Sequence, residues 1–529
     1  MKIFAKMQHI KVSPYAMNVE YLRELFIRLK NAGFDTVFIE YDENFPYPDF
    51  PELNGEVAYS TEEAAMIDVY ANESGLKVIP KCFSFSHSGI VTDKEKYKRL
   101  KDGSGMNLLS PESLELIING VDNLLAIHPR AEIIHLGGDE IGRLGGAPDT
   151  SEFIVRHGAS RLYVQFVNKL AAACRKRGVR AAIWSDVLIR HPEAVDELDR
   201  DVFIFYWDYW SYAERIHFLT IGGGLTDTFI LDRSKLPADL ENLYRLSIVR
   251  DKSEMPVGHL ERFARYWELD ETRSSSKGFA YFKWLSECGF DVVASMLPYP
   301  EKGSFLTNMD DKVVHARTFL REMERNSGFG FLACCWQPYW LPVAGIWPGL
   351  LLTMEMSRDL NIGSTAMYER AAAAMGDCWT GEALREYCSI GRHFEFSDIL
   401  NPFWSQTEIK TRVEWLSKAG WLEEDNWKAA SVDEKGDAFL DKWGNAIGDC
   451  IEKHFVEDLR WRAQCQLFCS GFSGFRRNGL LEEGRRLRAV FELHADRWFK
   501  PGSAGQCVDF RFKQWLEAVE TMRLSTNIG

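Results

Sequence analysis

Several features that define other protein classes are missing from this chain of 529 residues. It has no apolar run of about 20 residues, so no segment is predicted to span a bilayer. Its net charge is -14, which argues against a nucleic-acid or anionic-membrane partner, since both require a basic patch. No glycine-rich nucleotide-binding loop follows the first predicted strand, which weakens the case for an open, doubly wound sheet.

Cysteine pairing motifs are missing too. The eleven cysteines form no CxxC pair and no zinc-binding spacing. Scattered thiols in odd number are typical of a reducing cytosol. The opening MKIFAKMQHIKVSP has no apolar segment followed by a small-residue cleavage site, so we expect no signal peptide and a cytoplasmic location. We expect no metal and no cofactor, and the oligomeric state is not predicted.

What is present is a repeated unit over roughly the first 355 residues: a short apolar run, a polar loop and an amphipathic helix. Most of the runs are apolar on both faces, as strands of a buried parallel sheet are. One helix begins after Asn18 and ends at Gly33, and another has Ser110 as its cap. The apolar runs begin near residues 2, 35, 77, 132, 180, 202, 291 and 331.

Eight alternating units predict a (β/α)8 TIM barrel, because parallel strands are joined by helical crossovers. Residues 212–290 exceed one crossover and should form an insertion on the active face. From about residue 360 the periodicity is helical throughout. We therefore predict a catalytic barrel over residues 1–355 and an α-helical C-terminal domain over residues 356–529.

Carboxylates, histidines and tryptophans gather where the predicted strands end, which is the edge that carries the chemistry of such barrels. Aromatic walls with carboxylates, and without a lysine or arginine cluster, suit an uncharged sugar ring. The candidate residues are Glu40, Asp42, His87, His135, Asp139, Glu140, Trp184, Asp186, Trp207, Asp208, Trp336 and Tyr339.

The adjacent acids in HLGGDE are the most informative pair. Two carboxylates that straddle a glycosidic bond lie about 5–5.5 Å apart for retention or about 6.5–9.5 Å apart for inversion, which neighbours on one strand cannot easily arrange. They suit a scheme in which the 2-acetamido oxygen of the substrate is the nucleophile. We expect Glu140 to be the general acid, its pKa raised by Asp139 and apolar walls. Asp139 should stay ionised and hold the acetamido N–H. Gly137 and Gly138 should let the strand bend, so that both side chains face one pocket.

At this motif the sequence resembles a known family. HLGGDE resembles the H-x-G-G-D-E signature of the family 20 glycoside hydrolases, the β-N-acetylhexosaminidases. Further blocks resemble their hexosaminidase D-like branch in the same order, over roughly residues 2–350. Those blocks are FIEYDENFPYP, VIPKCFSFSHSGIV, IHPRAEIIHLGGDEIGRLG, AIWSDVL, FYWDY and CCWQPYW.

The resemblance implies that Glu140 is the acid/base and Asp139 orients the acetamido group. It makes His87 and His135 supporting residues, and it lines the pocket with Trp184, Trp207 and Trp336. The implied substrate is a glycan or glycoconjugate with a terminal β-linked N-acetylhexosamine. Classical members have an arginine at the end of strand one, but AKMQHIKVSP has none and its Lys11 matches no motif. Hydroxyl recognition must therefore differ, with Glu40 and Asp42 as candidates, and the choice between GlcNAc and GalNAc stays open.

Three other functions remain open at this stage. A conventional two-carboxylate glycosidase would use Glu140 as acid and Asp186 or Glu40 as nucleophile. A metal-dependent barrel hydrolase would use His87 and His135 together with Asp139 and Glu140. A non-catalytic sugar-binding barrel would bind N-acetylhexosamines without turnover.

Overall fold

A computed structural model defines the architecture. It describes residues 5–141, 144–209, 216–221, 228–235, 249–276, 279–298, 309–336, 343–390, 411, 413–414, 417–418, 420, 422–470, 472 and 479–526. No helix in these ranges is long and apolar enough to cross a bilayer.

The described residues contain an eight-stranded sheet whose neighbouring strands are all parallel. Its strand order is β3-β2-β1-β13-β12-β8-β7-β6, and the two end strands, β3 and β6, lie side by side. The sheet is therefore a nearly closed barrel, as predicted. Its strands are β1 (Ala5–Lys11), β2 (Thr36–Glu40), β3 (Lys77–Lys81), β6 (Ile133–His135), β7 (Arg180–Trp184), β8 (Phe203–Trp207), β12 (Val292–Met296) and β13 (Gly330–Ala333).

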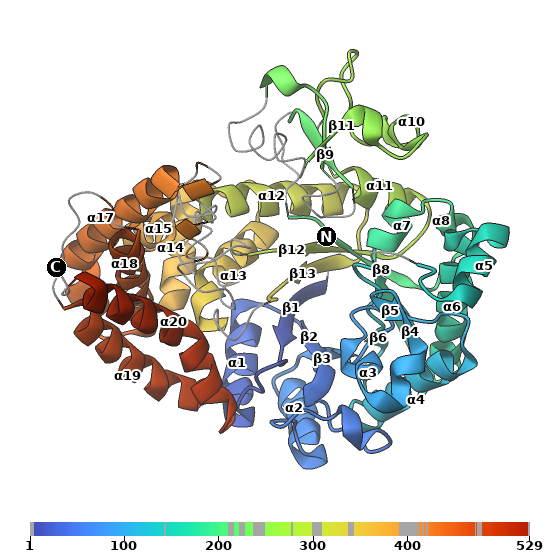
Figure 1. Cartoon of the computed structure of the whole chain (residues 1–529), viewed down its shortest axis with the longest axis horizontal. Helices are drawn as coiled ribbons and strands as arrows, with labels where there is room; N and C mark the ends of the chain where they lie inside the picture. Colours follow the sequence, from blue (N-terminus) through green and yellow to red (C-terminus); the bar gives the residue numbers. More distant parts are fainter. Residues whose placement is uncertain are drawn as a thin grey trace. The chain divides into compact units, whose positions relative to one another are not determined.

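Helices alternate with these strands, and Figure 1 shows α2, α4 and α6 on the outside of the sheet. The predicted caps are present: Asn18 accepts from the Glu20 amide at 2.9 Å, and Ser110 accepts from the Ser113 amide. The helices between β1 and β13 are α1 (Val19–Ala32), α2 (Thr61–Glu73), α3 (Gly89–Thr92), α4 (Pro111–Ile127), α5 (Pro148–His157), α6 (Ala159–Lys176), α7 (Asp186–Arg190), α8 (Ala194–Glu197), α10 (His259–Phe263), α11 (Ala280–Glu287) and α12 (Met309–Arg325).

The predicted insertion between β8 and β12 contains a small sheet of its own. Its strands, in the order β11-β10-β9, are β9 (Phe218–Thr220), β10 (Thr228–Ile230) and β11 (Arg250–Asp251). A separate two-stranded sheet, β4 (Lys101–Asp102) with β5 (Gly105–Met106), follows β3.

Aromatic rings fill the barrel below its mouth. His9, Phe38, His135, Trp184 and Phe205 come from five different strands, and all are fully or almost fully buried. Their ring centroids lie 4.6 to 5.9 Å from one another in the contacting pairs. This layer follows from strand alternation, which points every second side chain inward. We call these five residues the ring floor.

The chain divides into two compact units. The first comprises Met1–Pro14, Phe26–Met296 and Arg317–Cys334, and it holds all eight barrel strands. The second comprises Tyr15–Leu25, Leu297–Ala316 and Cys335–Gly529, and the residues after β13 that the structure describes are mainly helical, as predicted. Its helices after β13 are α13 (Val343–Arg358), α14 (Ser364–Met375), α15 (Gly381–Ser389), α17 (Leu422–Ile447), α18 (Ile451–Cys469), α19 (Leu480–Trp498) and α20 (Ser503–Thr526). The domain boundary at residues 355/356 stays a prediction.

Candidate active site

The HLGGDE segment leaves the sheet immediately after β6. The strand ends at His135, and φ is then +74° at Gly137, +88° at Gly138 and +49° at Glu140. A Cβ on Gly137 would lie 2.1 Å from Ser84 Oγ, so only glycine fits this backbone at this distance. The predicted break in the pleat is confirmed.

Side chains from the β3 side hold this turn in place. Ser84 Oγ donates to the Leu136 carbonyl at 2.9 Å and accepts from the Gly138 amide at 3.2 Å. Ser86 Oγ accepts from the same amide at 2.9 Å, and His135 Nδ1 accepts from the Gly137 amide at 3.0 Å. Two serines thus bridge the seam where β3 and β6 face each other, and they fix the position of the residues that follow.

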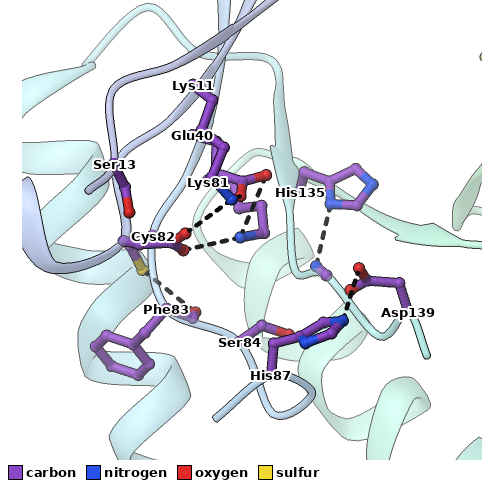
Figure 2. Close-up of polar contacts among 12 residues, drawn as sticks. Lys11, Ser13, Glu40, Lys81, Cys82, Phe83, Ser84, His87, His135 and Asp139 are labelled. Atoms are coloured by element: carbon purple, nitrogen blue, oxygen red, sulfur yellow. Dashed lines mark hydrogen bonds and ion pairs between the residues drawn. The ribbon is translucent and has the colours of Figure 1, made fainter. Parts of the chain in front are cut away.

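Both acids of the motif reach one imidazole. His87 Nε2 lies 3.5 Å from Asp139 Oδ2 and 3.1 Å from Glu140 Oε2. Figure 2 shows the imidazole turned toward Asp139. Ser86 Oγ also donates to Asp139 Oδ1 at 3.0 Å. The side chain of Asp139 is 19% exposed and that of Glu140 is 58% exposed, so Glu140 is the outer carboxylate. Both carboxylates thus contact the same imidazole, and the pocket that they are expected to share stays a prediction.

The protonation expected for this pair is reversed in the structure. The hydrogen bond from His87 lowers the pKa of Glu140, whereas burial raises the pKa of Asp139. In turn, the hydrogen bond to Glu140 raises the pKa of His87 to about 9. The prediction that Asp139 raises the pKa of Glu140 considered only the repulsion between neighbours. It was wrong because a cationic partner from the loop after β3 lies against both carboxylates.

Asp186 supports the turn from the start of α7. Its carboxylate is fully buried, and Oδ2 accepts from the Glu140 backbone amide at 2.6 Å. Burial, followed by the charge of Asp139, raises the pKa of Asp186 to about 7. Asp186 therefore anchors the backbone of the outer acid rather than lining an open pocket.

A row of alternating charges crosses the first three strands. Lys11 is the register partner of Glu40, and Glu40 is the register partner of Lys81. Glu40 Oε1 lies 2.7 Å from Lys11 Nζ, and Glu40 Oε2 lies 3.5 Å from Lys81 Nζ. Asp42 adds a second carboxylate, 3.0 Å from Lys81 Nζ and 3.7 Å from Lys11 Nζ. We call Lys11, Glu40, Asp42 and Lys81 the charged quartet; Figure 2 shows Lys11, Glu40 and Lys81 together.

The pKa shifts of Lys11, Glu40 and Lys81 all favour the charged form. Burial alone would raise the pKa of Glu40, but Lys11 and Lys81 hold it well below its usual range. Burial alone would lower the pKa of both lysines, yet the carboxylates of Glu40 and Asp42 raise it overall. The expectation that this mouth contains no lysine cluster was wrong. Strand alternation offered a signal, since Lys11 and Lys81 each end a strand on its inward face.

Two predicted site residues, Trp184 and His135, lie in the ring floor and not in the wall of the expected pocket. Trp184 is fully buried, with its ring 4.6 Å from His135 and 5.8 Å from Phe205. Burial holds the pKa of His135 well below its usual value, so its imidazole is neutral. In this structure Trp184 has no open face for a sugar, and the prediction that it lines the pocket needs this correction.

The remaining predicted residues differ in placement. The Asp208 carboxylate accepts from the Tyr206 hydroxyl at 2.8 Å, and the Tyr206 ring packs against Phe282 of α11. Asp208 therefore lies against Tyr206 just past the end of β8, and its assignment to the sugar site stays a prediction. Trp207 and Trp336 are half-buried, and the Trp207 ring lies 5.4 Å from that of Tyr209. Tyr339 lies outside the described residues.

Comparison with known proteins agrees with this site. Residues 40–223 match the model of the glycosyl hydrolase family 20 catalytic domain. Hexosaminidase D from Homo sapiens is 28% identical over 216 residues, covering 39% of this chain and 44% of the relative. Hexosaminidase D from Bos taurus is 28% identical over 197 residues, covering 36% and 57%. The chain thus spans about half the length of the curated relatives it matches.

Two solved structures are also similar. A β-N-acetylhexosaminidase from Bacteroides fragilis gives a TM-score of 0.43 at 15% identity, covering 67% of this chain and 65% of that one. An exo β-N-acetylglucosaminidase from Vibrio harveyi gives 0.46 at 13% identity, covering 73% and 59%. The family match runs from Glu40 through the paired acids to the insertion after β8. Residues 40–223 of this chain are therefore similar to the catalytic domain of family 20 of the glycoside hydrolases, and the chain is similar to hexosaminidase D proteins.

Proposed function

We propose that this protein is an exo-acting, retaining β-N-acetylhexosaminidase that uses the 2-acetamido group of its substrate as the nucleophile. The substrate class is a glycan or glycoconjugate with a terminal β-linked N-acetylhexosamine. The observation that carries the proposal is that Asp139 and Glu140 converge on one imidazole nitrogen, His87 Nε2. Two acids placed together suit a reaction whose nucleophile comes from the sugar itself.

The first step joins the acetamido carbonyl oxygen to C1 as the C1–O bond to the leaving group breaks. Glu140 gives its proton to the departing oxygen, and Asp139 accepts the acetamido N–H as positive charge develops there. The product is a cyclic oxazolinium-type intermediate bound to a carboxylate. Glu140 then removes a proton from water, water attacks C1, and the ring opens. Two displacements at C1 give net retention.

The proton for Glu140 is available from its partner. In the free enzyme His87 carries a proton and donates to ionised Glu140, because the pKa of His87 is raised to about 9. Transfer of that proton along the 3.1 Å contact produces neutral His87 and protonated Glu140. His87 thus stores the proton that the general acid needs and holds both carboxylates in place.

The geometry disfavours the conventional two-carboxylate scheme. Asp186 is fully buried and bound to the Glu140 amide, so its carboxylate is not free to attack C1. Glu40 is held by Lys11 and Lys81, and the lysines lower its pKa and its nucleophilicity. Neither residue is placed as an exposed nucleophile.

A metal-dependent mechanism gains no support either. His135 is buried in the ring floor, and its Nδ1 accepts a hydrogen bond from the Gly137 amide. Within the described part of the chain, no group of three or more His, Cys, Asp or Glu residues is arranged to hold a metal ion. Activity that survives dialysis against EDTA is the expected result.

The test compares variants on p-nitrophenyl N-acetyl-β-glucosaminide and the matching galactosaminide. We expect Asp139→Asn and Glu140→Gln each to lower kcat by about 100- to 10,000-fold, since each removes a group that acts in the transition state. With a dinitrophenyl leaving group, which needs no general acid, Glu140→Gln should regain most of its lost kcat. Asp139→Asn should not regain it. Glu132→Gln is the matched control, because Glu132 is exposed just before β6 and pairs with Lys77.

A thiazoline mimic of the intermediate should inhibit tightly. Hydrolysis of substrates that lack the acetamido group at a comparable rate would refute the substrate-assisted scheme. Tight binding of N-acetylhexosamines without turnover would instead support a sugar-binding barrel.

We also propose a cytoplasmic location for this activity. All eleven cysteines are free thiols, and burial raises the pKa of Cys82 and Cys507 to about 12. Such thiols suit a reducing compartment. Fractionation of the natural host with activity assays would test this, and activity confined to an oxidising compartment would refute it.

A further inference from the structure

The charged quartet borders the catalytic pair. Asp139 lies close enough for its charge to act on both Lys11 and Lys81, and Lys81 acts on His87 in the same way. Figure 2 shows Lys11, Glu40 and Lys81 in the same close-up as His87 and Asp139. A sugar held by the catalytic pair therefore has this quartet within its surroundings.

The quartet has an inner pair and an outer pair. The side chains of Glu40 and Lys81 are 4% and 7% exposed, whereas those of Lys11 and Asp42 are 22% and 21% exposed. The outer two are the ones a ligand can touch. Lys11 Nζ and Asp42 Oδ2 stand 3.7 Å apart, too far for a good hydrogen bond. A donor and an acceptor are thus held side by side without satisfying each other.

Two further observations indicate a built site. Buried Glu40 Oε2 has no hydrogen-bond partner among the described residues, although two cationic or imidazole nitrogens lie 3.5 and 3.6 Å away. Asp42 has φ +44°, a conformation that non-glycine residues adopt rarely, and the Tyr47 hydroxyl holds it by donating to its carbonyl at 2.6 Å. The surrounding structure thus maintains an uncommon backbone that directs Asp42 toward Lys11 and Lys81.

We propose that Lys11 and Asp42 bind adjacent ring hydroxyls of an uncharged hexosamine, and that Glu40 and Lys81 position them. The ammonium of Lys11 donates to one hydroxyl oxygen, and the carboxylate of Asp42 accepts from a neighbouring hydroxyl. The proposal rests on the function proposed above and names the residues that replace the absent strand-one arginine.

The charge balance of the quartet selects against anionic sugars. Two ammonium groups face two carboxylates, so their charges cancel, and Asp139 and Glu140 add negative charge nearby. A sulfate or phosphate ester on the ring would have to displace a carboxylate from a lysine. A vicinal diol matches the outer pair without that cost.

The experiment is a cycle between enzyme variants and deoxy substrates. Wild type, Lys11→Met and Asp42→Asn are assayed on the N-acetyl-β-hexosaminide and on its 3-, 4- and 6-deoxy analogues. Each variant should lower kcat/KM for the full substrate by about 10- to 100-fold, the range for hydrogen bonds to charged groups. Each variant should have one deoxy analogue on which its kcat/KM is less than about threefold below that of wild type. On that analogue the hydroxyl that the substituted residue binds is already absent, so the substitution removes no further contact.

Controls separate binding from folding. Lys77→Met makes the same change at the other end of β3, where Lys77 is exposed and paired with Glu132 at 2.8 Å, and it should leave kcat/KM unchanged. Melting temperatures identify a variant that fails to fold. If Lys11→Met does so, Asp42→Asn and the wild-type deoxy series still decide the matter.

The outcomes separate the two proposals. The quartet assignment is overturned if both variants stay within twofold of wild type, or if they lose the same factor on every deoxy analogue. If wild type hydrolyses no N-acetylhexosaminide, the proposed function fails instead. Calorimetric binding of methyl N-acetyl-β-hexosaminide to wild type and Asp42→Asn then tests the quartet directly, and equal affinity overturns it.

Discussion

His87 joins the two acids of the site from a backbone that few residues adopt. Its φ is +45°, and its Nε2 contacts carboxylate oxygens of both Asp139 and Glu140. A single cation between two anions leaves a net charge of -1, and it keeps both side chains within reach of one ligand. The strain at His87 is consistent with a residue held for function.

The first prediction concerns the pH dependence set by His87. Its raised pKa stabilises the folded state fully below about pH 6.5, and this contribution is lost as pH rises through about 9. The alkaline limb of wild-type kcat/KM should therefore lie near pH 9. In His87→Ala the stored proton is lost, so the limb should move to lower pH, and kcat/KM at pH 8 should fall about 100-fold.

His157→Ala is the control for this profile, because His157 is exposed at the end of α5 and is not one of the predicted site residues. The measurement is kcat/KM from pH 4 to pH 10 for the three proteins. An alkaline limb at the same pH in wild type and His87→Ala would contradict the role given to His87.

At the scale of elements, the seam between β3 and β6 shapes the site. These two strands end the hydrogen-bonded order of the sheet, and Ser84 and Ser86 bridge them through the Leu136 carbonyl and the Gly138 amide. The turn can approach so closely only because Gly137 has no Cβ. The same bridge places Ser86 against Asp139, so the barrel closure and the position of the acid depend on one another.

The second prediction tests that close approach. Gly137→Ala should lower the free energy of unfolding by about 2–5 kcal/mol, from the positive φ together with the collision with Ser84. Gly178→Ala is the matched control, because Gly178 has φ +79° but no atom within 4 Å of the position that an alanine Cβ would take. It should cost only about 1–2 kcal/mol. Urea unfolding of both variants gives the comparison, and equal losses would show that Ser84 does not constrain the turn.

The whole molecule is stabilised without covalent cross-links. Its eleven cysteines are all free, most of them buried, while Cys378 is exposed. Two adjacent thiols, Cys334 and Cys335, are buried just after β13, where the barrel core continues to the strand end. Packing of the barrel interior and of the helices therefore has to supply the stability that disulfides give to many secreted proteins.

The third prediction follows from this thiol pattern. In the native protein a thiol reagent should label Cys378 rapidly and the buried thiols slowly, because access controls the reaction. All eleven should react after unfolding in guanidinium. Reducing agents should leave the melting temperature unchanged, whereas a lower melting temperature after reduction would reveal a disulfide.

Much of the architecture was predictable from local pattern. Apolar runs separated by amphipathic helices predicted the barrel, and Asn18 and Ser110 predicted two helix starts. Gly137 and Gly138 predicted the break after β6, because glycine is the residue that most readily adopts the positive φ that the turn requires. The candidate acids and Glu40 were predictable because parallel strands end at one edge.

The direction in which each side chain points, and the partner that it meets across the barrel, were less predictable from the sequence. Asp208 directly follows a strand, and its carboxylate accepts from the Tyr206 hydroxyl. Trp184 was expected to line the pocket but is fully buried in the ring floor, where its indole packs against His135. Lys81 was overlooked because its partner Glu40 lies 41 residues away in sequence and meets it only through strand register.

The residues themselves determined the strands, the helices, the glycine turn and the identity of the two acids, because each depends on neighbours within a few positions. The tertiary structure alone decided which groups are protonated and what surrounds the sugar site. His87 reverses the pKa order expected for Asp139 and Glu140, and Lys11 and Lys81 neutralise Glu40 and Asp42. Electrostatic interactions act through space over a few ångströms, and folding sets those distances between residues that are remote in the chain.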